Sequence, residues 1–223
     1  MGVKPLAAIE SAPTSRTDWV TDRVRRAVLF GEVKAGERLI SGTWATRLGV
    51  SATPLREALH RLAAEGLVDY DPHFGARVAP LSTESACEIY ELRITLEPGA
   101  VESSVRSGDD AWRRELEYTF AQLHAIYDAV DFGKAQAHRA FHQTIRARCG
   151  SVWLLRIVDM LADQSTRLQL SFSSARGGAP AALQEHRDLF SAAKSGNASL
   201  AAELTAEHLR RSLEALRMGT TTS

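Results

Sequence analysis

The chain has 223 residues, of which 44% are hydrophobic and 24% charged, and its formal net charge is zero. This balance argues against a protein that coats nucleic acid without sequence preference, because such proteins carry a large excess of positive charge. No apolar run reaches the roughly 18 to 20 residues that span a bilayer, and the N-terminus lacks a secretory signal, so we expect a cytoplasmic protein without a membrane segment.

The first part of the chain predicts short helices separated by turns. Residues 1–14 are rich in Pro, Ala and Ser without periodicity and are expected to form a disordered tail. Apolar positions at helical spacing predict a helix from Thr17 that stops at Gly31. A short extended piece is expected within GEVKAGERLI, and a second short helix from Thr43 to Leu48.

The segment GVSATPLREALHRLAAEGLV predicts a helix that follows a tight turn. Gly49 ends the preceding helix, and Ser51 is expected to cap the next one by accepting a hydrogen bond from an open backbone amide. Pro54 lies in the first turn, where a missing amide costs little. Gly66 closes the helix, whose apolar stripe consists of Leu55, Ala58, Leu59 and Leu62. Two helices joined in this way predict a helix-turn-helix.

The next segment predicts a β-hairpin. GLVDY and GARVAP have the composition of two short strands, and DPHFG between them has the composition of a turn. A hairpin directly after a helix-turn-helix is typical of a winged helix. Residues 15–80 are therefore predicted to form a winged helix-turn-helix domain.

From residue 81 onward nearly every segment has helical periodicity, and none alternates like a strand. The sequence predicts an antiparallel α-helical bundle of about six helices over residues 81–218 and a short tail at 219–223, so the fold as a whole is mainly α. Pro98 lies inside the first helix and predicts a kink just after Arg93. The expected helices are 83–106, 109–130, 132–148, 151–173, 180–195 and 198–217.

Four of the seven histidines lie on apolar helix faces. His138 and His142 are one helical turn apart in AHRAFHQTI and therefore point to the same side. His186 and His208 lie on apolar stripes of two later helices. A single histidine on such a face is usually a hydrogen-bonded core residue, but four buried imidazoles need many partners, and one divalent cation can satisfy all their acceptor nitrogens. The pattern favours a metal centre.

Several of these runs resemble a known family. The run from GEVKAGERL through LGVSATPLREALHRLAAEGLV to FGARVAPLS resembles the DNA-binding domain of the GntR superfamily of bacterial transcription regulators, and EIYELRITLEPGAVE resembles the first helix of the all-helical FCD-type effector domain of the FadR-like subgroup. The resemblance implies a regulator and not an enzyme, with the helix after the turn in the major groove and the wing tip in the minor groove. The residues implied in DNA contact are Ser51, Thr53, Arg56 and Gly75.

Arg56 is the leading candidate for a base reader, because a guanidinium can bond bidentately to guanine, a contact worth about 1–3 kcal/mol of discrimination. The alternative is a solvated pair with Glu57, and Ser51 and Thr53 could be helix caps alone. The family often has arginine where this chain has Ala52, so we expect an altered base code. Since one domain makes few phosphate contacts, we expect a homodimer on a palindromic double-stranded operator.

The FadR-like resemblance also implies a metal site. Many members resemble metal-binding proteins whose ligands are an aspartate and three histidines, and the matching histidines here are His142, His186 and His208. His138 stands at the aspartate position, which keeps a ligand but removes a negative charge, so the centre should favour an anionic ligand. Imidazole ligands suit Zn, Ni or Cu, and a divalent transition metal, Zn or Ni first, is the expected cofactor.

The effector that the resemblance implies is a small carboxylate that bridges the metal and a cationic side chain. Arg93, in ELRITLE, is the leading partner because the matching family position often lines the pocket; its alternative is a salt bridge with Glu97 one turn later. Arg139 and Gln143 flank the histidines and are further candidates. Effector and metal are expected to shift the helices that carry the winged domains, and the family logic is repression relieved by a catabolite.

Two other functions compete with this one. A histidine-bound metal with an open position can activate water, as in metal-dependent hydrolases, but the residues between the first two histidines include no glutamate of the HExxH kind. A metal-independent regulator with a larger acyl ligand is the second alternative. Family members of that kind lack the histidine set, so its presence here argues against this function.

Overall fold

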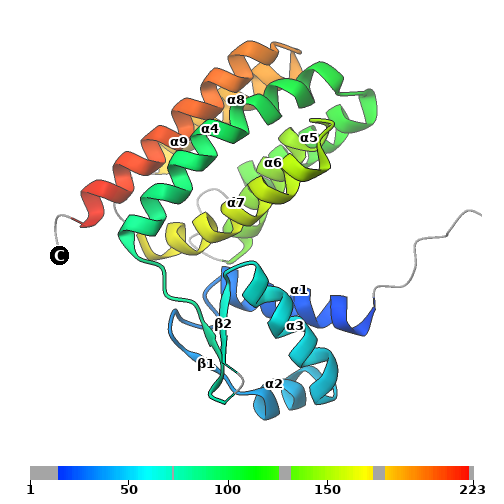
Figure 1. The fold of residues 1–223 in the computed structure, drawn as a ribbon. Helices are drawn as coiled ribbons and strands as arrows, with labels where there is room; N and C mark the ends of the chain where they lie inside the picture. Colours follow the sequence, from blue (N-terminus) through cyan, green and yellow to red (C-terminus); the bar gives the residue numbers. More distant parts are fainter. Residues whose placement is uncertain (1–14, 72, 126–131, 173–178, 221–223) are drawn as a thin grey trace, which may run out of the picture. The chain divides into compact units, whose positions relative to one another are not determined.

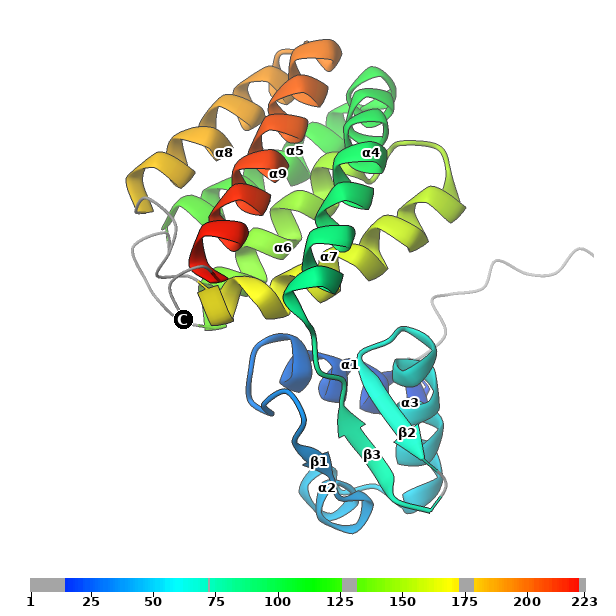
Figure 2. The same ribbon diagram turned by 60° about the vertical axis from the view of Figure 1, so that its left-hand side comes forward.

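The computed structural model divides into two compact units, with the main division after Pro80 and only residues 29–31 of the earlier chain assigned to the second unit (Figures 1 and 2). No helix among the described residues is long and apolar enough to cross a membrane. The predicted tail at 1–14 and the last residues of the chain, 221–223, lie outside the described part. The structure describes residues 15–71, 73–125, 132–172 and 179–220.

The described part of the first unit contains three helices and a three-stranded antiparallel sheet. The apolar stripe predicted for the helix after the turn is almost completely buried, and so are most of the apolar residues of the first helix. The most deeply buried side chains include Val20, Val24, Leu55, Leu59 and Leu62. In chain order the elements are α1 (Arg16–Leu29), β1 (Arg38–Leu39), α2 (Ser41–Leu48), α3 (Ala52–Ala64), β2 (Val68–Asp71) and β3 (Gly75–Val78).

A tight turn at Gly49 joins α2 to α3, as the helix-turn-helix prediction requires. Gly49 has a φ of 63°, in the left-handed region that favours glycine, and the backbone amide of Val50 donates to the carbonyl of Ala45 at 3.0 Å. α2 begins at Ser41, two residues earlier than predicted. Ser51 occupies the N-cap position of α3, but its side chain does not accept the predicted cap bond from a backbone amide there. The residue is exposed, so water can serve the hydroxyl and the open amides instead.

The predicted hairpin is confirmed as β2 and β3, and β1 adds a strand on the other side of β3. The register places Arg38 opposite Arg77, and Arg77 opposite Asp69. Because successive strand residues face opposite sides, these three charged residues form one row on the exposed face of the sheet. The inward-facing residues are Leu39, Val68, Ala76 and Val78.

The described part of the second unit is entirely helical, and the predicted helical bundle is confirmed (Figures 1 and 2). The helix bounds agree with the predicted ones within about three residues, except that α5 ends at Ala125 and residues 126–131 lie outside the described part. The elements are α4 (Thr83–Ser107), α5 (Asp110–Ala125), α6 (Phe132–Arg146), α7 (Val152–Phe172), α8 (Ala179–Lys194) and α9 (Ala198–Thr220).

The main apolar core of this unit joins α4, α5, α6, α8 and α9. Phe141 and Ile145 anchor α6 in it, and both are almost completely buried. Because they lie on one face of α6, they fix the rotation of this helix about its axis. The side chains next to them, among them His142, are thereby directed into the interior of the bundle.

α4 connects the core to the neighbouring helices, packing along α9 and α7. Ser82 caps it, since its Oγ accepts a hydrogen bond from the backbone amide of Ser85 at 3.1 Å. The helix continues without a break through Pro98. The kink expected just after Arg93 stays a prediction.

Candidate metal centre and nucleic-acid interface

Four histidine side chains converge inside the second unit. His138 and His142 come from α6, His186 from α8 and His208 from α9. One ligand nitrogen from each ring lies within 4.8 Å of the corresponding nitrogens of the others. His138 is half-buried and the other three are buried. The structure therefore brings together the four residues that the sequence predicted as a set.

The arrangement of these nitrogens fits a divalent transition metal. In a tetrahedral site with metal–nitrogen bonds of about 2.0–2.1 Å, neighbouring ligand atoms are about 3.3 Å apart. The Nε2 atoms of His142 and His186 are 3.1 Å apart. The Nδ1 of His186 lies 2.6 Å from the carbonyl oxygen of Ala182. A carbonyl only accepts hydrogen bonds, so Nδ1 carries the proton of the neutral ring and Nε2 keeps a lone pair for a ligand bond.

The protonation state of His142 also suits a ligand. Burial holds the pKa of His142 well below its ordinary value, and the neighbouring rings of His138, His208 and His186 lower it further. Only the neutral imidazole can bind a metal through its lone pair. His142 is therefore in its ligand form at neutral pH.

A small cationic cavity adjoins the two histidines of α6. Its volume is about 10 Å³, which is about enough for one water molecule. Three guanidinium groups face it, so an anion placed there would meet several hydrogen-bond donors. The lining residues are Arg93 of α4, His138, Arg139, His142 and Arg146 of α6, and Ala162 and Thr166 of α7.

Arg93 lines this cavity and also forms the salt bridge that was its alternative interpretation. Its Nε donates to Oε1 of Glu97 at 2.5 Å, and both side chains are almost completely buried. Burial alone would raise the pKa of Glu97, but the charges of Arg93 and Arg146 and the hydrogen bond from Arg93 bring it below the ordinary value. Glu97 is thus an ionised partner that holds Arg93 beside the histidines.

Sequence reasoning missed Arg146, which is only 1% exposed. Its Nη1 donates to the backbone oxygen of His142 at 2.6 Å, and its Nη2 donates to Oδ1 of Asp159 at 2.7 Å. Within the described structure its Nε is buried without a hydrogen-bond partner. A buried orphan donor is costly, and an acceptor in the cavity would relieve that cost. The available sequence signal was its position four residues after His142 on the same face.

The other two effector candidates lie at different distances from the cavity. Arg139 lines it, with Nε donating to Oδ1 of Asp163 at 2.6 Å and Nη1 donating to Oε1 of Gln143 at 3.0 Å. Gln143 accepts this bond and does not belong to the residues that line the cavity. The structure thus brings Arg93 and Arg139 to the histidines and places Gln143 behind Arg139.

In the first unit, the predicted DNA-contact residues Ser51, Thr53 and Arg56 are exposed at the start of α3. Glu57, the alternative partner of Arg56, instead accepts a hydrogen bond from Oγ1 of Thr17 at 2.8 Å. Arg56 forms no ion pair within the part of the chain that the structure describes. Its guanidinium is therefore available for a ligand.

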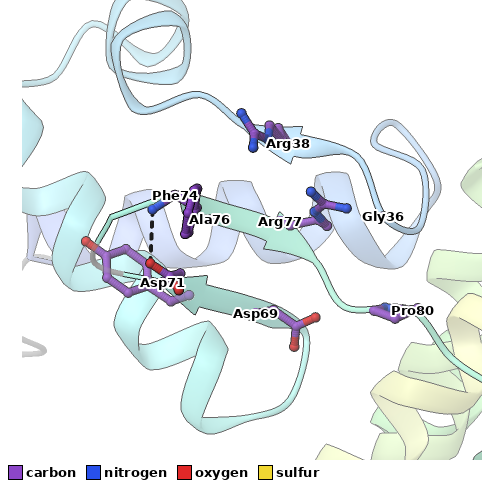
Figure 3. A pocket seen from close by; sticks show the side chains of 10 residues that line it. Gly36, Arg38, Asp69, Asp71, Phe74, Ala76, Arg77 and Pro80 are labelled. Atoms are coloured by element: carbon purple, nitrogen blue, oxygen red, sulfur yellow. Dashed lines mark hydrogen bonds between the residues drawn. The ribbon is translucent and has the colours of Figure 1, made fainter.

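The exposed face of the wing sheet adds two cations that sequence reasoning missed. Arg38 and Arg77 project from neighbouring strands over a hollow of about 700 Å³ (Figure 3). The sequence contained a signal for them, because both are basic and both fall at outward positions of strands. It did not reveal that β1 pairs with β3, which places them side by side.

The tip of the wing is held by Asp71. Its Oδ1 accepts a hydrogen bond from the backbone amide of Phe74 at 3.0 Å (Figure 3). The same oxygen accepts one from the backbone amide of His73 at 2.7 Å. Gly75 has a φ of 80°, and a Cβ there would meet no atom within 4 Å. Glycine is needed at this position for its backbone conformation, and the open space agrees with the predicted close approach to DNA.

Comparison with known families covers both units. The family described as bacterial regulatory proteins, gntR family, matches residues 16–78, and the FCD domain matches residues 88–211. The two matches together span most of the described chain. They fall on the winged unit and on the helical unit, respectively.

Individual relatives agree with these matches. An uncharacterized HTH-type transcriptional regulator, BphR, of Paraburkholderia xenovorans is 29% identical over 87% of this chain and 82% of its own length. The HTH-type transcriptional repressor GlaR of Escherichia coli is 28% identical over 83% of this chain and 89% of its own length. Among solved structures, E. coli McbR/YncC has the same fold, with a TM-score of 0.82 and 23% identity over 92% of this chain and 99% of that one.

Proposed function

The chain belongs to the gntR family of bacterial regulatory proteins and carries an FCD domain, and from this membership we propose that it is a transcriptional repressor controlled by a small carboxylate at a histidine-bound metal. DNA-binding transcription regulation is the activity of the family, and the relatives and folds that it matches are regulators, not enzymes. The observation that carries the proposed control is the convergence of four imidazoles beside a cavity lined by three arginines.

In this proposal a homodimer places two copies of α3 in the major groove of a palindromic operator, because one domain neutralises too few phosphates for useful affinity. The exposed row of Arg38 and Arg77 adds sequence-independent phosphate contacts. Ala52 is exposed and offers no side-chain donor, which alters the base code. The remaining contacts would come from Ser51, Thr53, Arg56 and Gly75.

We assign His138, His142, His186 and His208 as ligands of a divalent transition metal, Zn or Ni. FCD domains often bind metal, and the described part of this one has the necessary cluster. Imidazole ligands suit these ions better than Mg or Ca, which prefer oxygen. When bound, the ion supplies positive charge and a coordination position that an oxygen ligand can complete.

The effector would place a carboxylate between that centre and Arg93, with Arg139 and the orphan Nε of Arg146 as further donors. A cavity of about 10 Å³ is too small for an organic acid. The ligand can therefore enter only if side chains of α4, α6 or α7 move. α4 directly follows the winged domain in the chain, so a ligand that prefers one packing of α4 biases the state of the regulator.

Whether the protein represses or activates transcription is inferred from its relatives. GlaR is named a transcriptional repressor, and we propose that this chain also represses and that its carboxylate releases it from the operator. Both partners, chromosomal DNA and a metabolic acid, are found in the cytoplasm, which is the proposed location.

The test of the metal centre is thermal unfolding of chelator-treated protein with and without Zn²⁺ or Ni²⁺. Because ligands that bind only the folded state stabilise it, metal should raise the melting temperature, and a small carboxylate should raise it further only when metal is present. The double variant H142A/H186A should lose the metal-dependent shift. H73A, which removes an exposed histidine of the wing, should keep it.

An unchanged shift in the double variant contradicts the assigned ligands. A wild-type protein that ignores both ions but is stabilised by long-chain acyl compounds supports the metal-independent alternative. DNA binding is tested separately, by mobility shift with fragments from around the gene that encodes the protein. If the protein binds every fragment with equal affinity, the proposal of a sequence-specific operator is wrong.

A further inference from the structure

A carboxylate outside the ligand set contacts one of the four imidazoles. Glu185 on α8 immediately precedes His186, and its Oε2 lies 2.8 Å from Nδ1 of His208 on α9. Its other oxygen, Oε1, accepts a hydrogen bond from Nη1 of Arg211 at 3.0 Å. The Glu185 side chain is only 15% exposed. Both carboxylate oxygens of Glu185 therefore contact side chains of α9, and one of these side chains is His208, a candidate metal ligand.

We propose that Glu185 is a positioning residue for the metal centre, which fixes the ring and the tautomer of His208 and supplies a negative charge that the ligand set lacks. The proposal rests on the proposed metal centre and names a residue that acts on it through His208. It concerns metal affinity and is independent of the identity of the effector.

The tautomer follows from the chemistry of the contact. An ionised carboxylate can only accept hydrogen bonds, so the proton between Glu185 and His208 belongs to Nδ1. Nε2 of the neutral ring then carries the lone pair that a metal needs. The guanidinium of Arg211 donates to the other oxygen of Glu185 at 3.0 Å, and this charged partner favours the ionised form of the carboxylate.

The charge of Glu185 has a second consequence. Four neutral imidazoles bring no negative charge to a divalent ion, and the chain has His138 where the family pattern has an aspartate. A carboxylate hydrogen-bonded to the distal nitrogen of a ligand makes that ring a stronger base and a better ligand. Glu185 is separated from the ion by the ring of His208, and from there it restores part of the negative charge that a direct carboxylate ligand would provide.

Arg211 keeps Glu185 in place. It donates to Glu185 and also pairs with Glu207, one turn earlier on α9. His186 is oriented in a different way, by the backbone carbonyl of Ala182 at 2.6 Å. A carbonyl fixes a tautomer without adding charge. His186 thus has an orienting partner without charge, whereas the orienting partner of His208 also brings a negative charge.

The first measurement is the dissociation constant for Zn²⁺ by competition with a chromophoric chelator. Removing the orienting partner of a histidine ligand typically weakens metal binding about 10- to 100-fold, and this loss is expected for E185A. E185Q keeps an acceptor oxygen but not the charge, so its affinity should fall between those of E185A and wild type. E207Q is the matched control, because it changes a carboxylate that touches Arg211 and not the ring, and its affinity should equal that of wild type.

The second measurement separates positioning from a general structural role. In metal-free protein, ¹⁵N shifts of the His208 ring should report Nδ1–H in wild type and E207Q, and a mixture of tautomers in E185A. Loss of stability alone would leave the tautomer unchanged. If E185A does not fold, E185Q carries the affinity test, and an E185Q affinity equal to that of wild type overturns the charge contribution.

The outcomes distinguish this inference from the proposed function. If wild type binds neither Zn²⁺ nor Ni²⁺, the proposed metal centre is wrong, and the role of Glu185 at that centre is wrong with it. If wild type binds Zn²⁺ and folded E185A binds it equally well with the same His208 tautomer, the metal centre stands and the role of Glu185 is wrong.

Discussion

At the scale of single residues, the charged groups behind the histidines depend on one another. Glu97 lies within 2.5 Å of Arg93 and 3.9 Å of Arg146, and all three side chains are almost completely buried. A buried charge is tolerated only when it has a partner, since removal from water is expensive. Glu97 therefore determines whether two cavity-lining arginines can remain inside the bundle.

Replacing Glu97 by Ala should lower the free energy of unfolding by about 3–5 kcal/mol, because it leaves buried guanidinium charge without its partner. Urea denaturation of metal-free protein measures this. The control is D159N, which removes the other carboxylate partner of Arg146. The side chain of Asp159 is 42% exposed, so water can replace it and the loss should stay below about 1 kcal/mol. Equal losses for the two variants would contradict the central role of Glu97.

Arg56 belongs to the same scale in the DNA-binding unit. R56A should weaken binding to the operator by about 1–3 kcal/mol while changing binding to unrelated DNA little, because it removes a base contact. Fluorescence anisotropy with both DNAs measures the two affinities. R61A is the control: Arg61 is on the same helix but pairs with Asp18 at 2.5 Å. If R56A weakens both DNAs equally, Arg56 contacts phosphate rather than base edges.

The predictability of individual residues depended on whether their partners are local. The pair His138 and His142 was predictable because helical spacing alone puts both on one side. The bond between Glu185 and His208 joins residues 23 apart in the sequence, on different helices. The apolar period of a single helix does not show which residues of two helices face each other, because that is set by the packing of α8 on α9.

At the scale of elements, two glycines of the helix-turn-helix should respond in opposite ways to alanine. G49A should destabilise the winged unit by about 1–2 kcal/mol, because Gly49 has a φ of 63° and a Cβ is unfavourable there. Gly42 lies inside α2 with open space at its Cβ position. G42A should therefore stabilise by about 0.5–1 kcal/mol through helix propensity. Thermal unfolding monitored by circular dichroism shows whether each variant is more or less stable than wild type. Destabilisation by G42A would contradict the prediction.

The elements that sequence could predict were those with strong local boundaries. The helices of the second unit begin and end near caps, glycines and prolines, and the apolar period identifies each of them between these points. β1 has only two residues, too few for a period to show, and its pairing with β3 spans more than thirty residues of chain. The missing side-chain cap at Ser51 has a related cause, because solvent competes at an exposed helix end.

At the scale of the whole molecule, a net charge of zero conceals local differences that matter for DNA. The winged unit exposes Arg38 and Arg77 side by side and Arg56 on α3. The arginines of the second unit that line its cavity are buried or half-buried and bound to acidic side chains. Exposed arginines on the wing and on α3 therefore give the unit that matches the DNA-binding family positive charge that can contact phosphates, although the net charge of the chain gave no sign of it.

This distribution predicts how operator binding depends on salt. Each phosphate that a cation neutralises contributes about 0.9 to the slope of log K against log salt. A dimer presents Arg77 twice, so R77A should reduce the magnitude of that slope by about 1–2, while base discrimination stays the same. Anisotropy titrations at several salt concentrations measure it. R113A, which removes an exposed arginine of α5 paired with Asp110, should leave the slope unchanged. A wild-type slope in R77A would mean that the exposed wing face does not contact the DNA backbone, whereas a reduction near one would indicate that a single copy of this face is engaged.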